Sequence, residues 1–440
     1  MFGYILVICV VICQCQGQTQ VPVVQIRNTT TTSLHNELTE KIGNFSIELL
    51  YHTATTVPDR QNLIISPFTV WTALAVLSEG ASGRTKFEIN TALRLPPNGN
   101  RNVTRLSFSQ ISKWLQVNTG TVELAKFNGI FVDPNTLSKD EFKETAKKWY
   151  DTDMVSLSFN DTVHTANVLN TVISNITHGK IPKIVESSYF KEAKMIMASA
   201  VYFKGQWTVP FNTSSTMKQP FYDSNGKKIG EVNMMYNRFT YPFSNMKVLQ
   251  ARVIELPYGK ENRLSMVIML PNPGVSLEDM FLNFQKTNLD TFFEELRLSK
   301  EEYSDDEVDC FIPRFKIESD IDMTEVLRGR MGINNLFDVS KARLPHLART
   351  PMYVSKAIHK AEIEVTEEGT TAAAVTVVEF SNRIGVARFE ANRPFTFMIV
   401  EKVTNSIVFG ELVYNVGRGD IMLCGCCVEY PIVFLYSLYK

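Results

Sequence analysis

The chain has 440 residues, of which 44% are apolar and 21% charged, a balance typical of a globular protein with a large core. Its 45 basic and 46 acidic residues leave no basic excess that would indicate nucleic-acid binding, and no long charged run indicates an interaction tail. Of seven cysteines only Cys310 lies outside the two ends of the chain, so a hydrophobic core, not a disulfide framework, must hold the fold together. Its apolar neighbours indicate an inert core thiol.

Residues 1–17 have the pattern of a signal peptide. Residues 4–12 form an apolar run too short to span a bilayer, and Cys15 and Gly17 are suitably placed before a cut after Gly17. No Lys or Arg precedes the run, and the alternative is a buried N-terminal strand. Six Asn-x-Ser/Thr sequons favour a secreted, extracellular protein. One of them, Asn44, lies on an apparent helix face and is not counted among the candidate glycosylation sites. The candidate glycosylation sites are Asn28, Asn102, Asn160, Asn175 and Asn212.

Helices are predicted early in the chain, after a polar leader at 18–32. Apolar residues recur at three-to-four spacing over 34–49, which predicts an amphipathic helix. Ser66 as a cap and Pro67 at the first helical position predict a second helix, buried on most sides. No basic face stands out around a further helix at 107–116, so we expect no activation by glycosaminoglycans.

Strands are predicted in the middle of the chain and at its end. The apolar run 195–203 is typical of a strand covered on both faces. Further strands are predicted at 248–256 and 263–270, and a hairpin pairs 395–400 with 406–412. No repeat or interdomain linker interrupts this order, which indicates an α+β fold rather than repeated βαβ units.

Signatures of catalysis are missing from the sequence. It contains no Gly-x-Ser-x-Gly elbow, no His-Glu-x-x-His helix and no Walker loop. None of the six histidines lies at metal-binding spacing from another, and Cys424-Gly425-Cys426-Cys427 has no second ligand pair. We therefore expect no enzymatic activity, no metal and no cofactor.

The most informative segment is 367–380, which follows a strand-like run at 361–365. It begins Glu-Glu-Gly, continues with small residues and then becomes β-prone. If it formed a strand, one face would carry nothing large or charged, so it could enter between existing strands without a clash. The side chains on that face are Thr370, Ala372, Ala374, Thr376 and Val378.

This segment resembles the hinge of the serpins, the serine protease inhibitor family. Other family motifs follow in order and cover about residues 33–416, which leaves 417–440 as a tail outside the family pattern. The matching motifs are Asn62–Pro67, Leu77–Gly83, Thr177–Ile181, Tyr202–Trp207 with Pro210–Phe211, and Phe389–Phe395.

The resemblance implies one domain with three β-sheets, eight or nine helices and an exposed reactive-centre loop. A protease that cuts the loop would be acylated, and the hinge would then insert into the central sheet and distort the protease. The hinge residues are Glu367, Gly369, Thr370, Thr371, Ala372, Ala373, Ala374 and Val375.

The resemblance also locates the bond that is cut. The family places the residue before it sixteen positions after Glu367 and eleven before Pro394, and both spacings give Arg383. The predicted reactive bond is therefore Arg383–Ile384, and both spacings exclude the nearby Arg388. The alternative is that Arg383 is an ordinary exposed arginine without this role. Arginine fits the acidic specificity pocket of trypsin-like serine proteases, which makes such a protease, held in a covalent complex, the expected partner.

The sequence around the bond resembles an activation site. Arginine followed by isoleucine and a small residue, as in Arg383-Ile384-Gly385, is similar to the cleavage site of trypsin-like zymogens. We hypothesise that the target is an activating protease of an extracellular cascade; the alternative is that Ile384 is neutral.

Polar residues match a family cluster that controls opening of the central sheet. Ser66, Thr69 and His359 fit this cluster, but Ser199 stands where the family usually has Asn, which predicts a smaller network and easier opening. Trp207 matches the residue beneath the entering hinge, and the alternative role is a simple core aromatic.

Three further positions bear on the family pattern. Arg314 and Glu367 match a charged pair at the top of the sheet, and Val172 replaces a usual Trp, which we interpret as a tolerated core change.

The tail carries an Arg-Gly-Asp triplet at 418–420 and a cysteine-containing apolar stretch. Glu429 and Pro431 argue against a membrane span. A disordered segment, an interaction segment and a product of alternative exon use remain open.

Two rival functions remain. A non-inhibitory serpin acting as carrier, storage protein or chaperone would tend to have bulky or charged hinge residues, whereas Thr370 and Thr371 are small and uncharged. A secreted enzyme has no supporting constellation. We expect a secreted monomeric inhibitor that binds neither nucleic acid nor membranes.

Overall fold

The computed structural model describes residues 37–56, 61–96, 99–302, 306–369 and 386–415. The chain divides into two units, 1–32 and 33–440, and every described residue belongs to the second. No helix within these ranges is long and apolar enough to cross a membrane.

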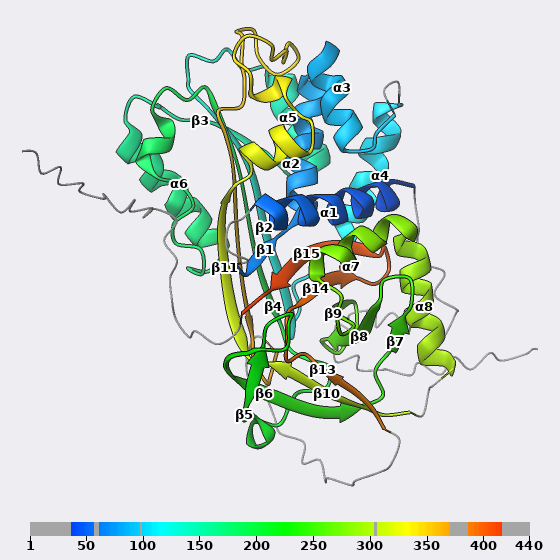
Figure 1. Ribbon diagram of the computed structural model, residues 1–440. Helices are drawn as coiled ribbons and strands as arrows, with labels where there is room; N and C mark the ends of the chain where they lie inside the picture. Colours follow the sequence, from blue (N-terminus) through cyan, green and yellow to red (C-terminus); the bar gives the residue numbers. More distant parts are fainter. Residues whose placement is uncertain (1–36, 57–60, 97–98, 303–305, 370–385, 416–440) are drawn as a thin grey trace, which may run out of the picture. The chain divides into compact units, whose positions relative to one another are not determined.

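Helices and three β-sheets make up the described unit, which confirms the predicted α+β fold (Figure 1). Eight α-helices and one π-helical segment, Val326–Arg330, occur in the described ranges and agree with the expected eight or nine. The α-helices are α1 (Glu37–Thr56), α2 (Pro67–Gly80), α3 (Gly83–Ala92), α4 (Arg101–Trp114), α5 (Asp140–Tyr150), α6 (Thr162–Ile176), α7 (Leu277–Asn283) and α8 (Leu289–Glu302).

The five-stranded sheet positions the candidate site. Its order is β11 (Phe315–Asp322), β12 (Lys356–Val365), β4 (Met195–Gly205), β2 (Val122–Val132) and β3 (Asp153–Ser156). Strands β12 and β4 are parallel neighbours, whereas β4 and β2 are antiparallel. In β4, Phe203 packs in the main core, while Ala198 and Ala200 pack in a second cluster with Leu169 and Ile173 of α6. Burial on both faces explains the continuous apolar run of β4.

The other two sheets complete the fold. The six-stranded sheet has the order β1 (Leu63–Ile65), β15 (Ser406–Val413), β14 (Phe395–Glu401), β9 (Leu264–Pro271), β8 (Ala251–Tyr258) and β7 (Phe243–Met246). The four-stranded sheet has the order β13 (Ala387–Glu390), β10 (Val308–Pro313), β6 (Lys228–Phe239) and β5 (Met217–Tyr222). The predicted hairpin is the antiparallel pair β14–β15.

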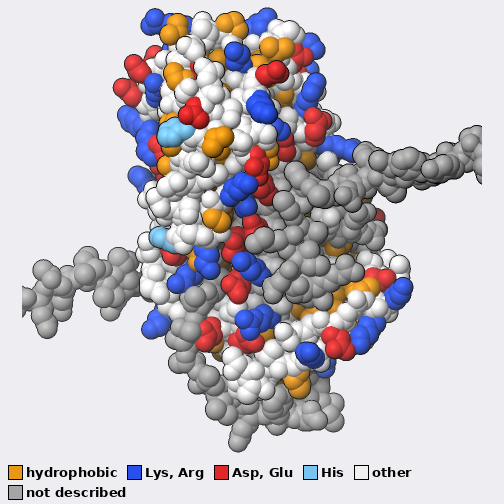
Figure 2. Space-filling model, turned by 90° about the vertical axis from the view of Figure 1, so that its left-hand side faces the viewer, with side chains coloured by type: hydrophobic (Ala, Val, Ile, Leu, Met, Phe, Trp, Pro, Cys, Tyr) orange, Lys and Arg blue, Asp and Glu red, His pale blue; other side chains and the backbone are white. Residues whose placement is uncertain are grey.

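Two charged side chains of β12, Lys360 and Glu362, are paired with side chains of β11. The Lys360 ammonium lies 2.8 Å from Glu318, and the Lys316 ammonium lies 3.1 Å from Glu362. Figure 2 shows basic and acidic side chains interspersed over this side of the molecule, so no single sign of charge dominates it.

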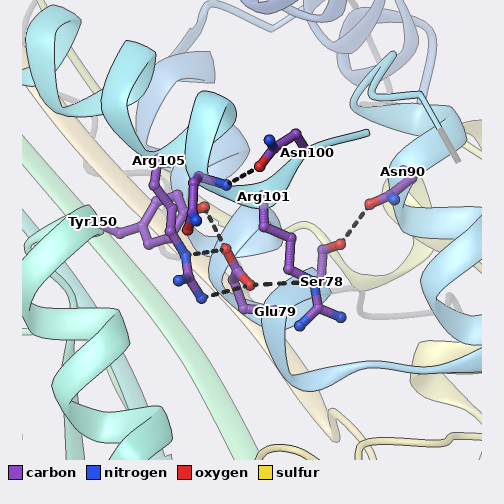
Figure 3. Close-up of polar contacts among 8 residues, drawn as sticks. Ser78, Glu79, Asn90, Asn100, Arg101, Arg105 and Tyr150 are labelled. Atoms are coloured by element: carbon purple, nitrogen blue, oxygen red, sulfur yellow. Dashed lines mark hydrogen bonds and ion pairs between the residues drawn. The ribbon is translucent and has the colours of Figure 1, made fainter. Parts of the chain in front are cut away.

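A buried carboxylate ties three helices together (Figure 3). Glu79 of α2 accepts two hydrogen bonds from the Arg105 guanidinium of α4, at 2.9 and 3.1 Å, and one from the Tyr150 hydroxyl of α5, at 3.0 Å. Arg101 approaches the same carboxylate at 3.8 Å. Burial, together with the nearby Glu79 charge, raises the pKa of Tyr150, so its hydroxyl stays protonated and donates.

Helix α2 begins as predicted at Pro67, but the predicted capping role of Ser66 is wrong. The Ser66 hydroxyl makes no cap hydrogen bond and donates instead to the carbonyl of Val408, at 2.6 Å. The reason is tertiary, because β15 places the Val408 carbonyl within reach of the side chain.

Three other local predictions need correction. The strand predicted from residue 248 begins at Ala251, since the preceding turn places Gln250 at φ +55°. Helix α4 begins at Arg101, six residues before the predicted start, with Asn100 as its cap. Val172 is 42% exposed on α6, so the inferred core substitution is wrong.

Candidate functional site

The predicted reactive bond, Arg383–Ile384, lies outside the described residues, as do the hinge positions from Thr370 to Val375. The structure describes the chain on both sides of this segment, up to Gly369 and again from Val386. The site is therefore built from these two flanks and from the strands that receive them.

Gly369 lies between the residues that directly follow the neighbouring strands β12 and β4. It forms bridges with Thr366, which directly follows β12, and with Gln206, which directly follows β4. Its φ of +102° strongly favours glycine. A Cβ here would clash with the Gly205 carbonyl oxygen and lie 2.6 Å from the Cα of Gln206, so both conformation and space exclude a side chain.

Trp207 anchors the turn that leads to Gly369. Its indole Nε1–H donates to the Thr366 carbonyl at 2.9 Å, and its backbone N–H donates to the Glu368 carbonyl at 3.1 Å. The ring stacks on Tyr258 with 4.4 Å between centroids and is almost fully buried. Trp207 thus contributes both to the core and to the position of the hinge, so the two interpretations of this residue are compatible.

Glu367 is buried, which is unusual for an acidic side chain. Its carboxylate accepts a hydrogen bond from the Thr216 hydroxyl at 2.8 Å and lies 3.8 Å from a nitrogen of Arg314, which is half-exposed. Its backbone carbonyl also accepts the N–H of Phe211 at 2.7 Å. The expected pair with Arg314 is present but long, and the shorter contact, to Thr216, has no signal in the sequence pattern.

The polar cluster forms around His359, which is fully buried in β12. Its Nε2 accepts the backbone N–H of Ser66 at 2.9 Å, so the ring proton must lie on Nδ1, which is 2.7 Å from the Ser199 hydroxyl. Thr69 joins through its hydroxyl, which donates to the Ser66 carbonyl at 3.0 Å. The four predicted residues therefore lie together and link α2 to the parallel strands β12 and β4.

Burial lowers the pKa of His359 to about 3, because desolvation disfavours the imidazolium. The geometry acts in the same direction, since a proton on Nε2 would face the N–H of Ser66. The cluster is intact only while this ring is neutral.

Asn128 of β2 belongs to the same region, although nothing in the local sequence pattern predicted it. It lies opposite Ser199 in the β2–β4 register and is buried. Its side-chain oxygen has no hydrogen-bond partner among the described residues. The His359 Nδ1–H donates to the Ser199 oxygen, and no hydrogen bond joins Ser199 to the Asn128 oxygen among the described residues, so the network ends at Ser199.

The sequons that the structure describes differ in exposure. The side chains of Asn102, Asn160 and Asn175 are exposed, whereas Asn212 is half-buried and its amide oxygen accepts hydrogen bonds from the backbone and hydroxyl of Ser214. Asn28 lies outside the described residues. Glycosylation at all five remains a prediction.

Cys310 is buried as predicted, and burial raises the pKa of its thiol. Within the part of the chain that the structure describes, no three His, Cys, Asp or Glu side chains form a group that could hold a metal ion.

The comparisons agree with this geometry. The model of the family described as Serpin (serine protease inhibitor) matches residues 40–415. The chain belongs to the serpin family. It is 32% identical to human Serpin B9 over 84% of this chain and 97% of that protein, and 32% identical to bovine leukocyte elastase inhibitor over 83% and 96%. Among solved structures, Serpin-12 of Manduca sexta is similar, with a TM-score of 0.73, 25% identity, and coverage of 86% of this chain and 98% of that one.

Replacement of Gly369 should disturb the hinge anchor. We expect Gly369→Ala to lower the thermal unfolding midpoint and to shift tryptophan fluorescence, because Trp207 must move to relieve the clash. Gly226→Ala is the matched control, since Gly226 has a φ of +80° but no neighbouring atom within 4 Å of the place that a Cβ would take. The control should lose only the roughly 1–2 kcal/mol of left-handed strain. Equal effects of the two variants would contradict the proposed clash.

Acid should destabilise the protein through His359. The unfolded chain binds a proton near pH 6.5 and the folded chain only near pH 3, so between these values stability falls as pH falls. His359→Gln keeps an acceptor and a donor but does not titrate. Urea unfolding from pH 7 to 4 should show a slope up to about 1.4 kcal/mol per pH unit steeper in the wild type than in this variant. Parallel curves would show that His359 does not titrate as inferred.

Proposed function

We propose that this serpin is a secreted inhibitor of trypsin-like serine proteases and acts as a suicide substrate. The protease cuts Arg383–Ile384, remains attached as an acyl-enzyme, and is trapped when the hinge inserts between β12 and β4. The observation that carries the proposal is the position of Gly369 between the ends of these two strands.

Strand register supports insertion at this place. In the β12–β4 pair, Glu362 faces Tyr202, and the same register continued by four residues places Thr366 opposite Gln206. Gly369 bridges both of these residues in antiparallel fashion. A strand that continued from Gly369, antiparallel to β12 and β4, would therefore be in register with both of these strands.

Such a strand would also satisfy its backbone groups on two sides. Each added hydrogen bond contributes about 0.5–1.5 kcal/mol net, and burial of apolar side chains adds to this. The small residues predicted for its inner face, such as Ala372 and Ala374, fit above the packed core without a steric penalty.

Specificity is assigned to Arg383. A trypsin-like pocket holds a buried carboxylate that pairs bidentately with arginine, and removal of the guanidinium leaves that acid unpaired at a loss of several kcal/mol. The family description and the name of the bovine relative support inhibition of serine proteases in general.

A gel assay with trypsin tests the mechanism. Wild-type protein should form a complex that survives denaturation and should release a fragment beginning at Ile384, and Arg383→Ala should abolish both. Thr370→Arg should still be cut but should not trap the enzyme, because its charge would have to enter the core as the strand inserts. Thr371→Arg is the matched control, since Thr371 belongs to the predicted outer face, and it should still trap.

Three outcomes of this assay oppose the proposal. Clean cleavage of the wild type without a complex would favour the non-inhibitory alternative. Complex formation by Arg383→Ala would place the reactive bond elsewhere. Equal trapping by Thr370→Arg and Thr371→Arg would contradict insertion of the hinge.

The same assay addresses the natural target. We propose an activating protease of an extracellular cascade, because Arg383-Ile384-Gly385 resembles a zymogen activation site. A panel of cascade activators and digestive trypsins should show faster trapping of the activators. Trapping of digestive trypsins alone would exclude the cascade role.

Secretion is proposed from residues 1–17 and the sequons. Expression in secreting cells should yield protein in the medium whose first residue is Gln18, and retention in the cell would contradict this.

A further inference from the structure

The strand that follows the predicted reactive bond carries an arginine that the proposed mechanism does not use. Strand β13 pairs in parallel with β10 at the edge of the four-stranded sheet (Figure 1). It begins at Ala387, four residues after Arg383, and its second residue is Arg388. The chain on this side of the reactive bond is thus fixed to the sheet almost at once.

Arg388 is held in place yet accessible. Its guanidinium carbon lies 4.4 Å from the centroid of the Phe311 ring, and its Nε lies 3.0 Å from the Glu390 carboxylate. The side chain is still 55% exposed. A cation–π contact at an exposed site is weak, but it orients the side chain without burying it.

The acid opposite Arg388 does not neutralise it. Asp309 is its register partner on β10, but the Asp309 carboxylate accepts hydrogen bonds from Arg238 at 2.7 and 3.1 Å and from the Tyr236 hydroxyl at 2.8 Å. Arg238 thereby balances Asp309, and Glu390 remains as the close acidic neighbour of Arg388.

Glu390 is shared among arginines. Arg393 lies within electrostatic range of both Glu390 and Arg252, and its guanidinium donates to the Pro271 carbonyl at 2.7 Å. Arg388 and Arg393 therefore share one glutamate, which leaves positive charge beside the end of the reactive segment. We call Arg388 and Arg393 the β13 arginines.

Covalent geometry brings Arg388 to a bound protease whatever path the intervening residues take. Arg388 lies five positions after Arg383, so the two Cα atoms lie no more than about 18 Å apart. A standard interface buries about 800 Å² on each partner, which corresponds to a disc of about 16 Å radius. Even with the chain fully extended, Arg388 thus lies close to the edge of the protease footprint or inside it.

We propose that the β13 arginines form a secondary recognition surface for trypsin-like proteases that carry carboxylates beside the cleft that binds the residues after the cut. This inference rests on the proposed function and refines its choice of partner. Charges at an interface rim act mainly on the rate of association and on its salt dependence. Arg383 would then restrict the partners to proteases with an acidic specificity pocket, and the β13 arginines would discriminate among the proteases that have this pocket.

Anionic and cationic trypsin provide the test, because they share arginine specificity and differ in surface charge. For Arg388→Glu, we expect the association rate with anionic trypsin at 50 mM salt to fall on the order of tenfold, and at 1 M salt to fall much less. Arg388→Gln should give a smaller fall. Cationic trypsin should react with Arg388→Glu no more slowly than with the wild type.

Arg349→Glu is the matched control. Arg349 is an exposed arginine in the segment that binds Leu137, so the variant makes the same change of charge away from β13. Equal rates for wild type, Arg349→Glu and Arg388→Glu with anionic trypsin at 50 mM salt would overturn the proposal. A loss of rate that is independent of salt would overturn it too.

Cleavage of Arg383–Ile384 is followed alongside complex formation, which separates the two proposals. If the wild type is cut but not trapped, the inhibitory mechanism fails, whereas the cleavage rate of Arg388→Glu still reports on recognition. If trapping succeeds and the rates are equal, only the recognition surface fails.

Discussion

The parallel pair of β12 and β4 is the contact on which the candidate site depends. The pair is complete from Lys356–Ile196 to Glu362–Tyr202, and yet Gly369 lies between the ends of the same two strands. The two strands are hydrogen-bonded to each other along their length, and beyond their ends the chain segments separate enough for Gly369 to lie between them. A further strand can enter only if these backbone hydrogen bonds exchange for twice as many new ones, which gives the proposed insertion both a barrier and a driving force.

The barrier is reinforced by groups that cross the β12–β4 boundary. His359 of β12 contacts Ser199 of β4 and Ser66, the residue before α2, so separation of the strands breaks at least one of its hydrogen bonds. Helix α6 adds apolar contacts across the same strands, since Ile358 of β12 and Ala198 of β4 share one cluster. The hydrogen-bonded groups around His359 are polar but uncharged, so they can be buried and can form their hydrogen bonds again after the strands separate. An ion pair in their place would carry a larger desolvation penalty.

Local pattern was enough to predict much of the fold, and contacts between distant segments account for what was missed. The apolar run of β4, the β14–β15 hairpin and the start of α2 at Pro67 depend on neighbouring residues, and they were predicted closely. Capping by Ser66 failed because Val408, far along the chain, competes for the hydroxyl. Asn128 was missed because only the β2–β4 register brings it opposite Ser199, and the early start of α4 was missed because its first turn is polar. The hinge and reactive bond came from family resemblance, since no periodicity distinguishes Arg383 from other arginines.

The proposed mechanism places opposite mechanical requirements on the two flanks of the reactive segment. On the side of Gly369, the chain must be able to continue into the sheet, and a residue without a side chain, held by backbone bridges and Trp207, meets that need. On the side of Arg388, the chain must stay fixed while the bond is cut, and β13 is paired to β10 over its four residues. Charge that helps to select the protease is best placed on the fixed flank, because it keeps its position during association. Charge on the inserting flank would have to be desolvated later. The distribution of residues follows this rule: small uncharged side chains lead away from Gly369, and arginines gather around β13.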